Sequence, residues 1–591
     1  MLSLTANARR VLEARYLRRD VERRICETPE ELFQRVARAV AHAELLLGSA
    51  RQAALWESEF LTLLSSLDFL PNSPTLMNAG TPLGQLSACF VLPVGDSMES
   101  IFEALKQMAL VQRTGGGTGF SFSGLRPARD LVASTGGEAS GPVSFMQIFD
   151  SATEHIRQGG RRRGANMGIL GVEHPDVLEF IRAKAGGTGL RNFNLSVGVT
   201  DEFMRAAQQG DRYALVHPRT RRTVGTVSAR EIFDAIVTAA WETGDPGLLF
   251  LDAINRANPT PDLGRIEATN PCGEIPLLPY EACTLGSINL AHMVSPGESH
   301  ASLDWDRLRE TTRKAVRFLD DVVEINRYPI TEIEHASRGT RKIGLGVMGF
   351  AEVLIRLGIS YAAGEAATMA DHVMACIAEA ARESSEALAR ERSVFPSWSR
   401  SVFGARGERL RNAVRTAIAP TGTIGILAGT SAGIEPLFAL AYRRSHVLEE
   451  QVLEEVNPLL SSHLRQRGLD ERRVLSEVVA RGTLDGVPGV PGDIRDLFVT
   501  ALQVPWEQHL RIQAAFQRHV DNAVSKTVNL PQDVSPETVA SVYRRAWELG
   551  LKGITIYRYG SLATQVLELG ADAETYHFDH AAKCDPTECR L

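Results

Sequence analysis

The sequence predicts an α/β protein, in which a large α/β unit follows a helical region. From residue 70 to about residue 560, short β-rich runs alternate with helical runs, and Gly- and Pro-rich loops separate them, as is typical of an α/β unit. Residues 1–65 instead carry apolar side chains at helical spacing. The 591 residues are 44% hydrophobic and 23% charged, a globular composition with enough apolar side chains for a large core.

Local patterns place individual elements. Thr28 and Pro29 form a helix start, and residues 30–37 continue it with apolar positions at helical spacing. Residues 193–199 predict a strand, and residues 366–390 predict a long Ala-rich helix.

The chain divides into three predicted regions. Residues 1–65 form a helical cap or support region, and residues 66–560 form one α/β unit, because no linker composition interrupts them. Residues 561–591 are polar and predict a flexible C-terminal tail.

Charge and cysteine content exclude several classes of protein. The net charge of −7 argues against binding to nucleic acid by bulk electrostatics, although small anionic ligands remain compatible with it. The N-terminal residues lack the apolar core of a signal peptide, and no segment offers eighteen uncharged apolar residues, so we expect a cytoplasmic protein without membrane contact. Seven scattered cysteines do not form a secreted disulfide scaffold.

Residues 268–283 are the first candidate for chemistry. Three prolines and a glycine within this segment exclude a long helix or a central strand, so it is expected to be a shaped loop. Asn270, Cys272 and Glu274 bring an amide, a thiol and a carboxylate within five residues, a set suited to hydrogen bonding, radical or nucleophilic chemistry, and proton transfer. The residues alone leave an equal alternative, a buried cysteine in a Pro-rich turn with Glu274 in solvent.

The run Asn270-Pro271-Cys272-Gly273-Glu274, with Cys283 nine residues beyond the Glu, resembles the finger loop of ribonucleotide reductases. Three further segments match that family in the same order. Residues 70–76 and 87–93 resemble the region that brings the partner cysteine Cys89, and residues 419–424 resemble the substrate-phosphate loop. The resemblance covers residues 70–560 and implies a ten-stranded α/β barrel threaded by the finger loop.

The resemblance also assigns roles. It implies that a Cys272 thiyl radical abstracts the 3′ hydrogen of a ribonucleotide, that Glu274 takes the 3′-hydroxyl proton and that Asn270 hydrogen-bonds the sugar. Cys89 and Cys283 would supply two electrons and end as a disulfide, which requires Cα atoms about 4.4–6.8 Å apart. The implied substrate contacts are Ser73, Ala88, Cys89, Gly117, Asn270, Pro271, Cys272, Gly273, Glu274, Pro420, Thr421, Gly422, Thr423 and Ile424.

The sequence evidence for the phosphate loop and for a second nucleotide site is weaker when each is considered without the resemblance. Residues 420–424 offer backbone N–H groups and two hydroxyls to an anion, but Pro-Thr-Gly-Thr is also an ordinary turn. Asp96, Ser97 and Arg126 resemble the family's specificity-effector site, and Arg163 lies in a loop that resembles the relay to the substrate base. Without the resemblance, the arginines around Arg163 would be read as a solvated face.

Two glycine-rich segments admit other interpretations. Residues 344–349 match G-x-G-x-x-G, which would indicate an NAD-binding dehydrogenase or another nucleotide-binding module if the motif followed a strand. We interpret them instead as structural turns and a helix start. Residues 115–119 permit close backbone approach to a ligand but lack the Lys of a P-loop.

The remaining cysteines receive separate interpretations. Cys584 and Cys589 in the tail resemble the redox-active cysteine pair of the reductase family, which implies that they are a shuttle that re-reduces the active-site disulfide. With His577 and His580 they also have spacings compatible with zinc, which stays an alternative. Cys26 and Cys376 are predicted to be inert residues in helices.

The radical source follows from motifs that are missing. The chain has no adjacent tyrosines near its C-terminal end, as large subunits with a separate radical-generating subunit have, and no glycyl-radical motif. The resemblance therefore favours adenosylcobalamin, and the partner-dependent large subunit is the alternative. The other implied partners are a ribonucleoside di- or triphosphate, a dNTP effector, a thioredoxin- or glutaredoxin-like reductant and a second copy in a homodimer. The N-terminal region is too short for a complete nucleotide-sensing cone, so overall control by ATP and dATP is not expected.

Overall fold

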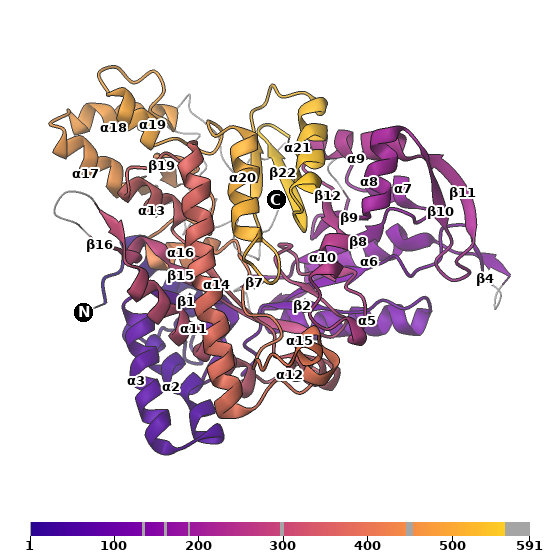
Figure 1. Ribbon diagram of the computed structural model, residues 1–591, viewed down its shortest axis with the longest axis horizontal. Helices are drawn as coiled ribbons and strands as arrows, with labels where there is room; N and C mark the ends of the chain where they lie inside the picture. The colour runs from indigo at the N-terminus through magenta and orange to yellow at the C-terminus, as the bar shows by residue number, and fades with distance from the viewer. Residues whose placement is uncertain are drawn as a thin grey trace.

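The chain begins with helices that pack on the outside of the main sheet (Figure 1). In this computed structural model, residues 2–132, 136–158, 162–186, 189–295, 301–444 and 453–561 are described. The N-terminal helices are α1 (Ala6–Val11), a π-helical turn at Leu12–Tyr16, α2 (Pro29–Leu47) and α3 (Ala50–Ser65).

Helix α2 starts where the sequence predicts. The Thr28 hydroxyl accepts a hydrogen bond from the Glu31 N–H at 3.2 Å, and the Glu31 carboxylate accepts one from the Thr28 N–H at 2.8 Å. This capping box satisfies N–H groups that the first helical turn leaves unpaired. The apolar face of α2 then packs on α3 and on α11 (Trp305–Ile325), so the helical region is anchored to the rest of the molecule.

The main sheet has ten strands and consists of two parallel sets. The first set runs β2 (Cys89–Val91), β3 (Gly117–Ser121), β8 (Asn166–Gly171), β9 (Phe193–Val199) and β12 (Gly247–Phe250). The second set contains β15 (Ala282–Asn289), β18 (Ile343–Met348), β21 (Thr527–Leu530) and β22 (Gly553–Arg558). The two sets meet antiparallel at β15 with β2 and at β12 with β22, while β1 (Phe69–Pro71) also pairs with β15.

Backbone hydrogen bonds outside the named strands join the two ends of this sheet. Residues 414–418 run parallel to β18, with a bridge between Leu345 and Thr416. The same segment bridges from Ile418 to Val524, just ahead of β21. The sheet therefore closes on itself, and the predicted α/β barrel is confirmed.

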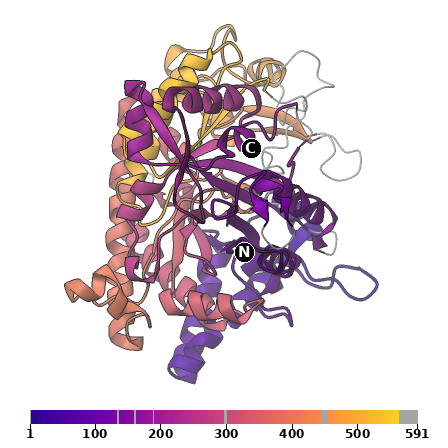
Figure 2. The ribbon, with the colours of Figure 1, turned by 90° about the vertical axis from the view of Figure 1, so that its right-hand side faces the viewer.

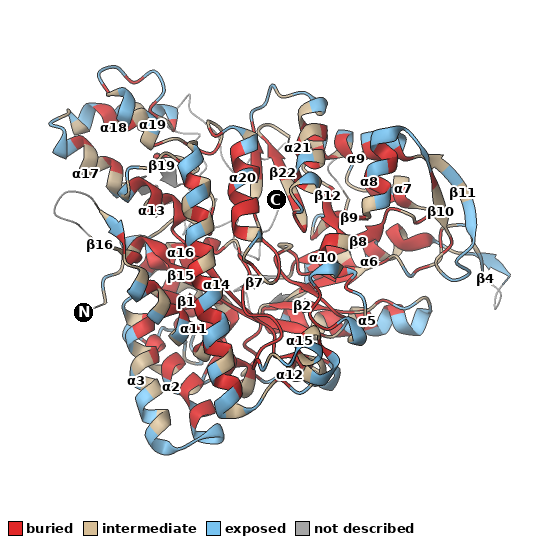
Figure 3. Ribbon diagram, in the orientation of Figure 1, coloured by how far each residue is buried: buried red, intermediate tan, exposed pale blue. Residues whose placement is uncertain are grey.

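Side-chain alternation along the strands separates the barrel interior from its outer layer. In β2, Cys89 and Val91 face an interior cluster, whereas Phe90 packs outward beneath the surrounding helices. The interior cluster also contains Ile275 and Leu277 of the predicted finger loop. The centre of the barrel is thus filled by the loop that carries the candidate chemistry, and the central strands are buried (Figure 3).

Helices cover the outside of the barrel. Figure 2 shows the N-terminal helices, in indigo, below the sheet and the C-terminal helices, in yellow, at its upper end. The helix predicted at 366–390 is α14 (Gly364–Arg392), and the strand predicted at 193–199 is β9. The other helices are α4 (Ser73–Asn78), α5 (Met98–Arg113), α6 (Gly141–His155), α7 (Val177–Ile181), α8 (Asp201–Gln209), α9 (Ala229–Thr243), α10 (Leu251–Arg256), α12 (Thr331–Thr340), α13 (Phe350–Arg356), α15 (Val402–Arg406), α16 (Gly422–Ala428), α17 (Pro458–Gln466), α18 (Glu471–Arg481), α19 (Gly492–Leu497), α20 (Trp506–Gln517) and α21 (Pro536–Glu548).

The G-x-G-x-x-G segment was predicted to form structural turns and a helix start, but most of it is a strand. Residues 343–348 form the buried strand β18, and only Gly349, with φ of 78°, begins a helix. A Cβ at Gly346 would overlap the carbonyl oxygen of Ala417, so this glycine allows the neighbouring barrel segment to approach. The motif is itself a strand and does not follow one, which removes the dinucleotide interpretation.

Among the helices of the described residues, none is both long and apolar enough to cross a membrane.

Candidate active site

The finger loop is a short hairpin inside the barrel. Strands β13 (Ala268–Thr269) and β14 (Pro276–Leu277) pair antiparallel and leave residues 270–275 at the tip. Gly273 adopts φ of 83°, a left-handed conformation that favours glycine, and its N–H donates to the Asn270 carbonyl at 3.1 Å. The tip is therefore a tight turn, and Cys272 on this turn is half-buried.

Barrel strands hold the tip in place. The Asn194 side chain of β9 donates to the Pro271 carbonyl at 2.8 Å, and the Ala523 N–H donates to the Glu274 carbonyl at 3.0 Å. On β3, a Cβ at Gly119 would overlap the Thr269 carbonyl oxygen. Residues 115–119 thus permit close backbone approach as predicted, but what approaches is the finger loop.

Asn270, Glu274 and Cys89 form one buried network. The Asn270 amide donates to Cys89 Sγ at 3.1 Å, and Cys89 Sγ lies 4.0 Å from Glu274 Oε1. Glu274 is only 2% exposed, and its Oε2 has no hydrogen-bond partner among the described residues. Burial raises the pKa of Glu274 to about 7, while the Asn270 hydrogen bond opposes that rise. Near neutral pH this carboxyl can therefore accept or give a proton.

The structure brings Cys89 and Cys283 together. They lie directly opposite each other in the antiparallel register of β2 and β15. Antiparallel partners have Cα atoms roughly 4.5–5.5 Å apart, which is within the range of about 4.4–6.8 Å that a disulfide needs. Burial raises the pKa of the Cys283 thiol far above its ordinary value, so Cys283 is a neutral thiol in this environment.

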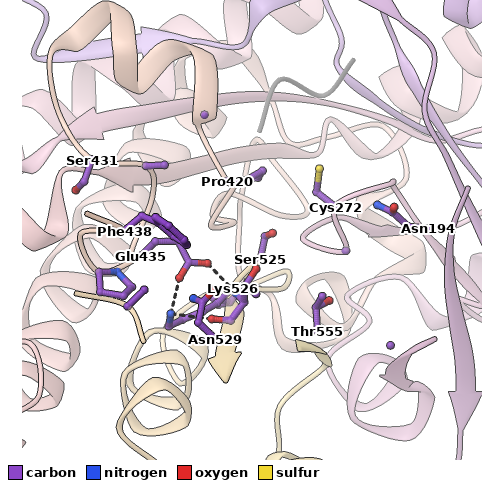
Figure 4. Close-up of a pocket in the computed structure, with 18 of the residues that line it drawn as sticks. Asn194, Cys272, Pro420, Ser431, Glu435, Phe438, Ser525, Lys526, Asn529 and Thr555 are labelled. Carbon is purple, nitrogen blue, oxygen red and sulfur yellow. Dashed lines mark hydrogen bonds and ion pairs between the residues drawn. The ribbon is translucent and has the colours of Figure 1, made fainter. Parts of the chain in front are cut away.

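Cys272 faces a cavity of about 340 Å³ on the other side of the loop (Figure 4). Pro420 and Gly422 of the predicted phosphate loop line the same cavity. Its wall also includes Glu435, Phe438, Ser525, Lys526, Asn529 and Thr555. The volume falls within the range of about 300–1,000 Å³ that is usual for small-molecule sites.

Residues 420–424 start helix α16. Thr421 precedes the helix with φ of 51°, and its hydroxyl oxygen accepts a hydrogen bond from the Gly433 N–H at 2.7 Å. Thr423 is buried, and its hydroxyl lacks a hydrogen-bond partner within the part of the chain that the structure describes. The N–H groups of a first helical turn have no partners inside the helix, so this loop presents donors at the cavity edge.

Comparisons with known proteins agree with this geometry. The family description "Ribonucleotide reductase, all-alpha domain" matches residues 2–84, and "Ribonucleotide reductase, barrel domain" matches residues 87–408 and 405–557. The chain belongs to the ribonucleotide reductase family. The reductase barrel predicted from the finger-loop motif is thereby confirmed, and the dehydrogenase alternative is excluded.

Several relatives resemble this reductase along most of its length. The vitamin B12-dependent ribonucleoside-diphosphate reductase of Mycobacterium tuberculosis strain H37Rv is 53% identical over 573 residues, covering 96% of this chain and 80% of the relative. The protein of that description from Thermoplasma acidophilum is 48% identical and covers 97% of this chain and 81% of the relative. The class Id ribonucleotide reductase alpha subunit of Actinobacillus ureae shares the fold, with a TM-score of 0.75 at 23% identity over 94% of this chain and 97% of that one.

The other predicted substrate contacts have partners within the protein. The Ser73 hydroxyl at the start of α4 lies 2.7 Å from the Tyr16 hydroxyl. The Ala88 carbonyl accepts the Gly117 N–H at 2.8 Å, and a Cβ at Gly117 would lie 2.9 Å from the Pro271 ring. Ser73, Ala88 and Gly117 are not among the residues that line the cavity beside Cys272.

Asp96, Ser97 and Arg126, three of the predicted effector residues, lie together at the start of α5. Arg126 Nη2 lies 3.1 Å from Asp96 Oδ2, and the hydrogen bond to Asp96 raises the pKa of Arg126. The Ser97 hydroxyl caps α5 by accepting from the Ser100 N–H at 3.1 Å. Arg163 lies in β7 (Arg162–Arg163), opposite Arg157 of β6 (Arg157–Gln158). Asp96 and Arg126, which were both predicted to contact an effector, therefore pair with each other.

The tail residues Cys584, Cys589, His577 and His580 lie outside the described residues. Within the described part of the chain, no three His, Cys, Asp or Glu side chains gather in a way that could hold a metal ion. Cys376 is buried in α14 as predicted, but the prediction for Cys26 was wrong. Cys26 is exposed in an extended segment ahead of α2, because the helix starts only at Pro29.

Two ionic clusters near the site, each with a buried lysine, were not predicted from the sequence. On the cavity wall, Lys526 Nζ lies 2.5 Å from Glu435 Oε2 and 3.0 Å from His509 Nδ1 (Figure 4). Behind Cys283, Lys342 Nζ lies 2.5 Å from Glu281 Oε2. No sequence motif marks either cluster. Each cluster joins charged residues from separate parts of the chain, so no local pattern in the sequence could single it out.

Proposed function

We propose that this chain reduces ribonucleoside diphosphates to 2′-deoxyribonucleotides through a Cys272 thiyl radical, with adenosylcobalamin as the radical source. The names of relatives at 48% and 53% identity support both the diphosphate substrate and the cobalamin cofactor. The observation that carries the proposal is the placement of Cys272 between two regions, the cavity on one side and the Glu274–Cys89–Cys283 cluster on the other.

The cavity beside Cys272, at about 340 Å³, is smaller than the whole of adenosylcobalamin and could hold only the adenosyl end of that cofactor. Its wall is more apolar than polar, and its polar groups include the Lys526–Glu435 pair and Ser525. Such a mixture is usual for sites that hold organic cofactors. When bound, adenosylcobalamin supplies the organic radical that removes the hydrogen atom from the Cys272 thiol. Phe438, Ser525 and Asn529 are the lining residues that we expect to contact this end of the cofactor, because Pro420 belongs to the loop proposed for the substrate phosphates.

The chain's own residues then carry out the reduction. The Cys272 thiyl takes the 3′ hydrogen atom of the ribose, and Glu274 accepts the 3′-hydroxyl proton through its unpartnered Oε2. The 2′-hydroxyl leaves as water with one proton from the Cys89–Cys283 pair, the second proton of the pair goes to C2′, and Glu274 returns the proton of the 3′-hydroxyl. Cys89 and Cys283 provide two electrons and two protons as they form a disulfide, and Cys272 returns its hydrogen atom to C3′. The N–H groups of residues 422–424 and the Thr423 hydroxyl hold the substrate phosphates.

A dNTP effector and a second copy of the chain complete the proposal. The effector would bind at Asp96, Ser97, Arg126 and Arg163, which requires the Asp96–Arg126 pair to open. The second copy would bind next to this site. Met98 and Phe102 on α5 and Ile148 on α6 are exposed by 56%, 46% and 38%, which is unusual for large apolar side chains on neighbouring helices. A thioredoxin- or glutaredoxin-like protein would supply electrons through Cys584 and Cys589.

Reconstitution tests the proposal. The purified chain, adenosylcobalamin, CDP and dithiothreitol are expected to yield dCDP, measured by chromatography, and CTP is expected to react more slowly. Cys272→Ser should reduce turnover to background because serine forms no comparable radical, whereas the exposed Cys26→Ser is the matched control and should be fully active. If dCDP forms only after a second protein is added, the cobalamin assignment is wrong and the partner-dependent alternative holds.

A further inference from the structure

The Glu281–Lys342 ion pair is buried next to the proposed reducing cysteines and has no role in the steps above. The two side chains are only 2% and 1% exposed. Glu281 also accepts hydrogen bonds from the Leu278 N–H and the Thr340 hydroxyl, each at 2.8 Å. Removing two charges from water costs several kcal/mol per ion, and a buried pair is therefore weak evidence for a purely stabilising role.

Strand register places Lys342 beside Cys283. Thr284 of β15 is paired with Ile343 of β18, and the residues immediately before them are Cys283 and Lys342. The Cys283 Sγ lies 3.6 Å from the Lys342 carbonyl oxygen. Strand β15 pairs with β18 along one edge and with β2 along the other, where Cys89 is opposite Cys283. Cys89, Cys283 and Lys342 therefore form a row across three adjacent segments of the sheet.

The charge of Lys342 acts on the Cys283 sulfur. Burial is the main cause of the raised pKa of Cys283, and the Lys342 ammonium is the largest charge effect that lowers that pKa. Glu274 and Glu281 oppose it. A reduced Cys283 thiol does not need this ammonium, because it is neutral. A Cys283 thiolate does need it, since an isolated anion in this environment would be strongly disfavoured.

We propose that Lys342 is a positioning residue for disulfide re-reduction, where it stabilises Cys283 as the thiolate that leaves when a dithiol attacks Cys89. This rests on the proposed function of Cys89 and Cys283 as the redox pair. Cys89 is the accessible sulfur of the two, with 5% of its surface exposed against 0% for Cys283. The attacking thiol therefore reaches Cys89, and the buried sulfur is the leaving group.

The step balances as an ordinary thiol–disulfide exchange. The thiolate of an external dithiol bonds to Cys89 Sγ, the Cys89–Cys283 bond breaks, and its electron pair stays on Cys283 Sγ beside Lys342. The second thiol of the dithiol then attacks the mixed disulfide and releases Cys89. Cys89 and Cys283 end as thiols after taking the two protons of the dithiol, which ends as a disulfide. A leaving group of lower pKa departs faster, and Lys342 supplies that effect.

Rapid-quench measurements on the oxidised full chain test this role. One turnover without reductant, in a Cys584→Ser/Cys589→Ser background, forms the Cys89–Cys283 disulfide. Dithiothreitol is then added, and alkylation with mass spectrometry follows the return of both thiols. We expect Lys342→Met to slow re-reduction roughly tenfold, because the pKa of the Cys283 leaving group rises without the ammonium and a leaving thiol of higher pKa departs more slowly. The yield of dCDP in the first turnover should stay the same.

Substitution of Glu281 provides a control, because it should change the re-reduction rate in the opposite direction. Glu281→Gln removes the countercharge and leaves the ammonium in place, so re-reduction should be as fast as in the parent or faster. The double variant Glu281→Gln/Lys342→Met has no buried charge and should be as slow as Lys342→Met alone. If both single variants are slow and the double variant recovers, the pair has only a structural role and the proposal is wrong. A mixed disulfide trapped on Cys283 instead of Cys89 would also overturn it.

The same experiment separates this inference from the function on which it rests. If Cys89→Ser and Cys283→Ser each give full multiple turnover with dithiothreitol, these cysteines are not the redox pair and the proposed function is wrong. If both cysteine variants fail while Lys342→Met is re-reduced at the parental rate, the redox pair holds and only the role of Lys342 is refuted.

Discussion

At the residue scale, Glu274 shows how burial prepares a side chain for proton transfer at a cost in stability. The pKa of Glu274 is raised to about 7, above the usual value of 4.5, because the carboxyl is buried. Between pH 4.5 and about pH 7, the folded chain therefore keeps Glu274 protonated while the unfolded chain does not. The free energy of unfolding falls as the pH rises through this range. The full cost, about 3 kcal/mol, is present above pH 7.

Glu274→Gln should separate the two effects. Above pH 7 we expect a higher thermal unfolding midpoint, since a neutral amide is buried instead of a carboxylate, and no gain below about pH 4.5. Turnover should fall by about 10² or more, because the amide cannot accept a proton. Calorimetry across this pH range and a dCDP assay measure both, with the exposed Glu267→Gln as the control. Equal midpoints of parent and Glu274→Gln at pH 8 would contradict the role of burial.

The sequence predicts some of these residues and misses others for a physical reason. Asn270, Cys272 and Glu274 are recognisable because they are adjacent in one motif. Asn194 contacts the same loop, and Lys342 lies beside Cys283, but both come from other parts of the chain and no local pattern marks them. The pKa of Glu274 likewise follows from burial by segments far away in the chain, such as the one that carries Cys89.

At the element scale, helix starts are more predictable than glycine-rich strands. The capping box at Thr28 and Glu31 is complete within four residues, so the start of α2 is correctly predicted. The glycines of β18 were predicted to form turns, because the close contact that requires glycine is made with a segment far away in the chain. They leave room for residues 414–418, which run along β18 inside the closed sheet.

Gly119 gives a test of how tightly the finger loop is held. A Cβ at this position would overlap the Thr269 carbonyl, so Gly119→Ala should displace the hairpin that carries Cys272. We expect a loss of stability of about 1–3 kcal/mol and a much larger fractional loss of turnover. Denaturant unfolding and the dCDP assay measure these effects. Gly364→Ala is the matched control, since no atom lies within 4 Å of its added Cβ. Full activity of Gly119→Ala would show that the loop position is not critical.

At the scale of the whole molecule, barrel closure and the attachment of the helical region depend on contacts between distant segments. Closure requires residues 414–418 and 522–525, which no local β pattern distinguishes from loops. The helical region is joined to the barrel by Glu44 of α2, which pairs with Arg317 of α11 and Arg392 of α14. Only the family resemblance made the barrel predictable, because composition and periodicity indicate no more than an α/β unit.

The exposed apolar face formed by Met98, Phe102 and Ile148 makes a prediction about assembly. If this face is the homodimer interface, Phe102→Glu with Ile148→Glu should convert a dimer into a monomer in sedimentation velocity, because two carboxylates per copy would be buried without partners. The monomer should still reduce CDP, since the cavity and the finger loop lie within one chain, but it should lose the change in substrate preference that dNTPs cause. Leu55→Glu, at a side chain on α3 that is 56% exposed, is the control and should remain dimeric. A parent chain that sediments as a monomer, or a variant that stays dimeric, would assign this face another role.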